Sequence, residues 1–93
     1  MDETILLVDD DAALLEVTSI VLASEGYRVV TAEDGAEALR ILGREGLDLV
    51  VLDIMLPDIN GKAVCQRIRS DSTMDQIKVI CISGMVEQDK VKQ

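Results

Sequence analysis

The chain has 93 residues, of which 48% are hydrophobic and 29% charged, a composition typical of one small globular domain with an aliphatic core. Its formal net charge of -9 argues against direct nucleic-acid binding, because neutralising phosphates requires clustered lysine and arginine. No apolar run could span a bilayer, and Asp2 and Glu3 stand where a secretory signal would carry basic residues, so we expect a cytoplasmic protein without membrane contact.

The residue types also restrict the chemistry of the chain. It contains no histidine, which removes the commonest general base and the commonest transition-metal ligand. Cys65 and Cys81 lie in apolar segments without the CxxC spacing of metal or redox sites, so we expect two buried thiols without such a function. Any chemistry is therefore expected to use carboxylates, hydroxyls or lysine.

Short apolar runs alternate along the chain with segments of helical period. The runs are rich in β-branched residues or leucine, which is typical of strands, and they comprise Ile5 to Val8, Arg28 to Ala32, Leu49 to Leu52 and Lys78 to Ile82. Their continuous apolar character predicts a sheet that is covered on both faces.

The first helix is predicted over Ala12 to Ser24, with Asp11 as its N-terminal cap and Gly26 as its C-terminal cap. It carries an apolar stripe made of Leu14, Val17 and Val21. A second helix opens with the capping pair Asp34 and Glu37 and ends near Gly43. A third is predicted over Gly61 to Ser70, and a last one begins near Val86.

Strands that alternate with helices predict an α/β fold with a doubly wound parallel sheet and right-handed crossovers. In the flavodoxin-like strand order, the functional crevice lies beyond the carboxyl ends of the first and third strands. The first strand is followed by Asp9 and Asp10, the third by Asp53 and the fourth by Ser83. Three carboxylates and a hydroxyl are therefore expected around one pocket.

Such an oxygen-rich pocket suits a hard divalent cation such as Mg²⁺. Two unit charges about 4 Å apart repel by roughly 4 kcal/mol at an effective dielectric of about 20, and a cation would cancel this repulsion. An aspartate beside Mg²⁺ can also attack phosphorus and form an acyl phosphate. Acids at a strand end are more often solvated loop residues, but the pairing of Asp9 and Asp10 with Asp53 favours a site.

The segments ILLVDDD, VVLDIMLPDING and VICISG resemble the three signature blocks of the receiver domain of bacterial two-component response regulators. The resemblance runs from Ile5 to the end of the chain and implies a phosphorylation-dependent signalling switch rather than an enzyme. Such a domain accepts a phosphoryl group from a histidine kinase or histidine phosphotransfer protein and relays the signal to an effector domain or protein. At most it assists its own phosphorylation and dephosphorylation.

The resemblance also implies a role for individual residues. Asp53 would be the phosphoacceptor and a metal ligand, Asp10 a direct Mg²⁺ ligand, and Asp9 a ligand acting mainly through water. The backbone carbonyl of Met55 would complete the metal shell. Ser83 would be the switch hydroxyl that bonds the phosphoryl group.

The resemblance is incomplete at its C-terminal end. The family continues to a fifth strand with a Lys-Pro pair and to a fifth helix, and neither Lys90 nor Lys92 replaces that lysine by position. We therefore expect residues 1–93 to form one C-terminally incomplete receiver domain, with strand order 2-1-3-4. The fourth strand would be an apolar edge, and without a fifth helix aliphatic surface would lie exposed beside Leu14, Val17 and Val21. The chain is therefore expected to self-associate or to be marginally folded.

Two other function classes remain alternatives. A phosphate-independent interaction module, or degenerate receiver, gains weight only from the missing lysine. A Mg²⁺-dependent phosphohydrolase with an aspartate nucleophile expects a second acid two residues after the nucleophile, where this chain has Met55. The phosphorylation-dependent switch is the reading that these residues favour.

Overall fold

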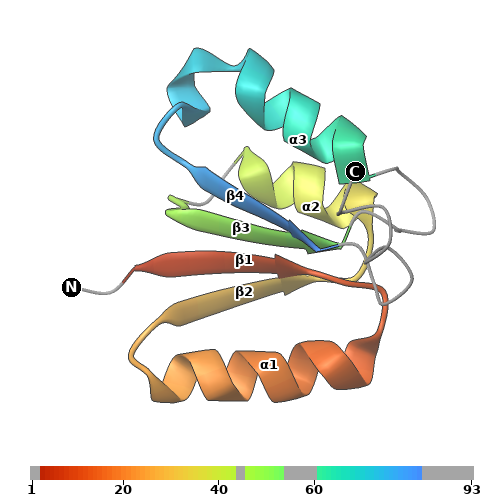
Figure 1. Ribbon diagram of the computed structural model, residues 1–93, viewed down its shortest axis with the longest axis vertical. Helices are drawn as coiled ribbons and strands as arrows, with labels where there is room; N and C mark the ends of the chain where they lie inside the picture. The colour runs from red at the N-terminus through yellow and green to blue at the C-terminus, as the bar shows by residue number, and fades with distance from the viewer. Residues whose placement is uncertain (1–2, 44–45, 54–60, 83–93) are drawn as a thin grey trace, which may run out of the picture.

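The computed structural model describes residues 3–43, 46–53 and 61–82. These residues form a parallel sheet in the order β2-β1-β3-β4, with α1 on one face and α2 and α3 on the other (Figure 1). The elements in chain order are β1 (Thr4–Val8), α1 (Ala12–Ser24), β2 (Arg28–Ala32), α2 (Gly35–Leu42), β3 (Leu49–Asp53), α3 (Gly61–Ser70), a 3₁₀ turn (Ser72–Met74) and β4 (Lys78–Ile82). The predicted fold class and strand order are confirmed; the helix expected from Val86 lies outside the described residues.

The core lies between the sheet and helices α2 and α3, which cover one of its faces. Its largest fully buried side chains come from the two central strands and from α3, and they are Leu6, Val8, Val50, Leu52, Val64 and Ile68. All five residues of β1 are buried, as the continuous apolar runs predicted. That prediction is wrong for β4, because this strand is an edge of the described sheet and four of its five residues are exposed.

Helix α1 begins and ends at the predicted caps. The Leu14 N–H donates to the Asp11 carboxylate over 3.1 Å, which satisfies one of the free amides of the first turn. At the other end Gly26 has a φ of 100°, and the Tyr27 N–H donates to the Leu22 carbonyl over 3.3 Å. This is the glycine-dependent Schellman ending, which turns the chain back toward β2.

Helix α2 begins at the predicted capping pair. The Asp34 carboxylate accepts the Glu37 N–H at 2.8 Å, and the Glu37 carboxylate accepts the N–H of Glu33 at 3.0 Å. The helix ends at Leu42, one residue before the predicted Gly43. Two short-range signals in the sequence therefore set both ends of this element.

The predicted apolar stripe of α1 does not pack against the sheet. Leu14, Val17 and Val21 are 49%, 59% and 55% exposed, whereas Leu15 is buried. Helix α1 contacts β1 and β2, so it leaves the β3 and β4 side of the same face uncovered. This surface, which we call the open face, comprises Leu14, Val17, Val21, Ile80 and Ile82. The expected aliphatic surface beside α1 is thus present in the described part of the chain.

Among the described residues, no helix combines the length and apolar character needed to cross a membrane.

Candidate functional site

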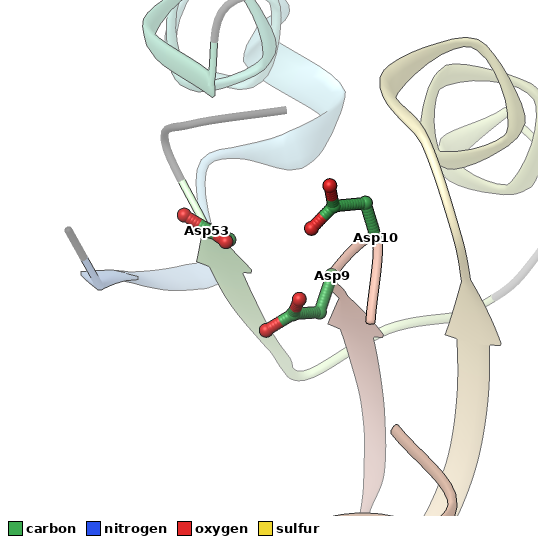
Figure 2. Close-up of side chains that lie close together, drawn as sticks. All are labelled: Asp9, Asp10 and Asp53. Carbon is green, nitrogen blue, oxygen red and sulfur yellow. The ribbon is translucent and has the colours of Figure 1, made fainter. Parts of the chain in front are cut away.

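Three carboxylates meet at the carboxyl end of the sheet (Figure 2). Asp9 and Asp10 directly follow β1, and Asp53 is the last residue of β3. Each contributes an oxygen that lies within 4.8 Å of the oxygens from the other two. The structure therefore brings together the three acidic side chains that the sequence assigned to one pocket.

The pairing of β1 with β3 brings these segments side by side. The two strands are in parallel register from Ile5 opposite Leu49 to Val8 opposite Leu52, so the residues that follow reach the same edge. At the opposite end, Asp48 fixes the start of this pairing. Its carboxylate accepts the Thr4 N–H at 2.8 Å and its own N–H donates to the Thr4 carbonyl at 2.9 Å.

Asp9 is held by two hydrogen bonds. Its backbone N–H donates to the Ala32 carbonyl of β2 over 3.1 Å, and its carboxylate accepts the Asp11 N–H over 3.0 Å. Burial raises the pKa of Asp9, and the charges of Asp53, Asp10 and Asp11 raise it further, against the lowering effect of the hydrogen bond from Asp11. In the absence of a cation, the pocket therefore disfavours the charged form of this carboxylate.

The neighbouring acids have different environments. Asp10 is exposed and Asp53 is half-buried. Asp11 stays outside the cluster, because its carboxylate caps α1, as its position predicted. Met55 and Ser83, the two other predicted site residues, lie outside the described residues, so their roles stay predictions.

The donor set fits a hard cation. Three carboxylates offer oxygen ligands from two adjacent strands, and the exposure of Asp10 leaves one side open to water. Mg²⁺ commonly takes one or two carboxylates and retains several waters, which such a half-open cluster permits. The cluster is therefore able to hold Mg²⁺ and to place it beside the Asp53 carboxylate.

A hollow of about 420 Å³ lies elsewhere, at the amino ends of the strands. Its lining includes Glu3, Tyr27, Asp48 and Lys78. Because parallel strands carry their functional loops at the carboxyl ends, and because the three acids converge there, we place the candidate site at the acidic cluster rather than at this hollow.

Sequence reasoning missed one pair of chemically reactive groups. The Sγ atoms of Cys65 on α3 and Cys81 on β4 lie 2.9 Å apart. The prediction of two buried thiols is wrong: Cys65 is only half-buried, and Cys81 is exposed on β4, which is an edge of the sheet formed by the described residues. The spacing along the chain gave no signal, since only the packing of α3 on the sheet brings the two residues together.

Known proteins with similar sequences identify the family of the chain. Residues 5–93 match the response regulator receiver domain. The protein named probable transcriptional regulator ycf27 from Guillardia theta is 41% identical over 86 residues, covering 92% of this chain and 34% of the relative. The DNA-binding response regulator MtrA of Mycolicibacterium paratuberculosis is 47% identical over 72 residues, covering 77% and 32%. The chain thus spans about a third of the length of these curated relatives.

Solved structures share the fold. The response regulator TrrA from Thermotoga maritima, crystallised in complex with Mg²⁺-BeF, aligns with a TM-score of 0.82 and 34% identity, covering 96% of this chain and 76% of that one. The chemotaxis response regulator CheY4 of Vibrio cholerae aligns with a TM-score of 0.89 and 25% identity, covering 99% and 77%. With the strand order and the matched residues in agreement, the chain belongs to the response regulator receiver domain family.

Proposed function

We propose that residues 1–93 act as a receiver domain, C-terminally incomplete in this sequence, that switches signalling when Asp53 accepts a phosphoryl group. The donor is a histidine kinase or histidine phosphotransfer protein, and the reaction requires Mg²⁺. The observation that carries the proposal is the convergence of Asp9, Asp10 and Asp53 within 4.8 Å at the carboxyl ends of β1 and β3. The crystal structure of TrrA, described as a complex with Mg²⁺-BeF, adds support from a similar chain.

The environments of Asp9 and Asp10 suggest a different role in metal binding for each. Asp10 is exposed and directly follows β1, and it would be the direct Mg²⁺ ligand. Asp9 already accepts the Asp11 N–H, so it would contribute to the metal site mainly through water. By position in the family's signature blocks, the Met55 carbonyl would complete the metal shell and the Ser83 hydroxyl would bond the phosphoryl group.

The chemistry is a phosphoryl transfer between two side chains. An Asp53 oxygen attacks phosphorus, the new P–O bond forms as the P–N bond of the donor phosphohistidine breaks, and the donor imidazole leaves with the electron pair. These 93 residues contain no histidine, so the donor imidazole lies outside them. Mg²⁺ supplies positive charge that stabilises the transferring group. The phosphorylated domain then acts on a downstream effector domain or protein.

Labelling with a small acyl phosphate in the presence of Mg²⁺ tests this proposal. The parent chain should form a hydroxylamine-labile adduct, and Asp53→Asn should abolish it. Asp11→Asn is the matched control, because it removes a nearby carboxylate that belongs to the α1 cap, and it should retain labelling. Full labelling of Asp53→Asn would refute the assignment, and a parent that never labels would favour the phosphate-independent interaction module.

A further inference from the structure

Two cysteines lie close together outside the acidic cluster, on elements that do not carry its three aspartates. Cys65 lies on α3 and Cys81 lies on β4, and their Sγ atoms are 2.9 Å apart. A disulfide bond is about 2.05 Å long, so the two sulfur atoms need to approach by less than about 1 Å to reach bonding distance. Both residues are free thiols in the structure.

The two thiols differ in their surroundings. Cys81 is exposed on the edge strand, whereas Cys65 is half-buried. Burial, followed by the hydrogen bond to Cys81 and the charge of Cys81, raises the pKa of Cys65 to about 11, against an opposing effect of Arg69. Cys65 therefore stays protonated at neutral pH, and Cys81 is the thiol that a dissolved oxidant reaches first.

We propose that Cys65 and Cys81 are a redox modification site, which a hydroperoxide converts into an intramolecular disulfide between α3 and β4. The Cys81 thiolate attacks one peroxide oxygen, the O–O bond breaks, hydroxide leaves and Cys81 becomes a sulfenic acid. The Cys65 sulfur then attacks the Cys81 sulfur; the S–S bond forms, the S–O bond breaks, and the Cys65 proton leaves with the departing hydroxide as water. A thiol reductant restores both cysteines.

The disulfide would act close to the acidic cluster. In the β3 and β4 register, Cys81 stands opposite Leu52 and Ile82 stands opposite Asp53. The bond would therefore tie the carboxyl end of β4 to α3, one residue from the partner of Asp53. The bond depends only on the two thiols, so testing for it does not require that Asp53 is phosphorylated.

Hydrogen peroxide treatment of the whole chain tests the site. The folded parent should lose both free thiols and the mass of two hydrogen atoms, remain a single covalent chain on a non-reducing gel, and recover both thiols with dithiothreitol. The same treatment in concentrated urea should form the bond more slowly, because unfolding separates the two sulfurs. Equal rates in the two conditions, or oxidation only to sulfinic acid or to disulfide-linked dimers, would overturn the proposal.

Two single variants complete the experiment. Cys65→Ser should trap a sulfenic acid on Cys81, whereas Cys81→Ser should leave Cys65 slow to react. The oxidised parent should melt on the order of 10 °C higher than the reduced parent, since the bond closes a loop of about 15 residues, and neither variant should show this rise. A parent whose thiols survive an oxidant dose that consumes Cys81 in Cys65→Ser would also overturn it.

Discussion

Asp9, Asp10 and Asp53 oppose one another electrostatically until a cation lies between them. Burial and the neighbouring charges raise the pKa of Asp9, so assembling the charged cluster lowers the stability of the metal-free folded state. The charge of Asp11 adds to this repulsion, but its carboxylate also accepts the Leu14 N–H at the start of α1. The effect of each aspartate on stability therefore depends on what its oxygens contact.

Magnesium should therefore stabilise the folded chain. At about 100 times its dissociation constant, a ligand that binds only the folded state adds roughly 2.7 kcal/mol, which for a chain of this size raises the melting temperature by about 10 to 20 °C. Asp10→Asn should lose most of this response, and its metal-free form should melt higher than the metal-free parent because repulsion is relieved.

Thermal melts with and without Mg²⁺ measure this effect. Asp11→Asn is the control, because it makes the same change of charge beside the cluster and Asn caps a helix about as well as Asp. It should keep the Mg²⁺ response. A parent melting curve that ignores added Mg²⁺ would contradict the metal site.

At the scale of the elements, local signals predicted most of the fold. The bounds of α1 and α3 agree with those predicted from the sequence. For α1 the reason is that Asp11 and Gly26 are short-range signals that flank the helix. The 3₁₀ turn at Ser72–Met74 was not predicted, since it depends on a single Asp71 carboxylate that accepts the Thr73 N–H. The exposure of the α1 stripe agrees with the expectation drawn from the missing fifth helix, whereas periodicity alone identifies an apolar face without saying what covers it.

The candidate site followed from the sequence to a similar extent. The positions of Asp9, Asp10 and Asp53 could be predicted because parallel strands bring their carboxyl ends to one edge. The contact between Cys65 and Cys81 could not, because it depends on how α3 packs over an edge strand. Residues at the ends of parallel strands can be identified from the sequence. Contacts between a helix and a strand can be identified only from the packed structure.

The C-terminal cap of α1 provides a test at this scale. Gly26→Ala should destabilise the chain by about 1 to 2 kcal/mol, because an L-residue with a φ of 100° is strained. An added Cβ at this position meets no atom within 4 Å, so the cost comes from the backbone alone.

Urea denaturation of the variants measures this cost. Gly46→Ala is the matched control, since its Cβ also meets nothing within 4 Å and its φ is not in the left-handed region. It should be neutral or slightly stabilising. Equal effects of the two substitutions would show that the conformation of Gly26 is not what stabilises the cap.

At the scale of the whole molecule, the open face is a large apolar surface. Ile80 and Ile82 on β4 are each about half exposed, and they lie on the same side of the sheet as the exposed stripe of α1. An edge strand also presents unpaired backbone groups that can pair with another chain. Both features favour association, whereas the net charge of -9 opposes it through long-range repulsion.

We therefore expect the 93-residue polypeptide to self-associate as its concentration rises, more strongly in high salt, where the repulsion is screened. Ile80→Lys should shift the equilibrium toward monomer, because a charge on an edge strand discourages pairing. Thr31→Lys places the same charge on the opposite edge strand, β2, and should leave the association unchanged. Sedimentation over a wide concentration range decides the matter, and a parent that stays monomeric throughout would contradict this account.

The pairing of β1 with β3 has a consequence for the order of folding. No helix or turn can bring Asp53 to Asp9, because β3, which ends at Asp53, and β1, which Asp9 follows, are separated in the chain by α1, β2 and α2. Contacts between such distant segments form slowly, since the intervening loop must first be closed. We expect the contact between these strand ends to be completed late, so Mg²⁺ held by residues from both should slow unfolding more than it speeds folding. The acidic cluster would then keep the central strands paired once the fold has formed.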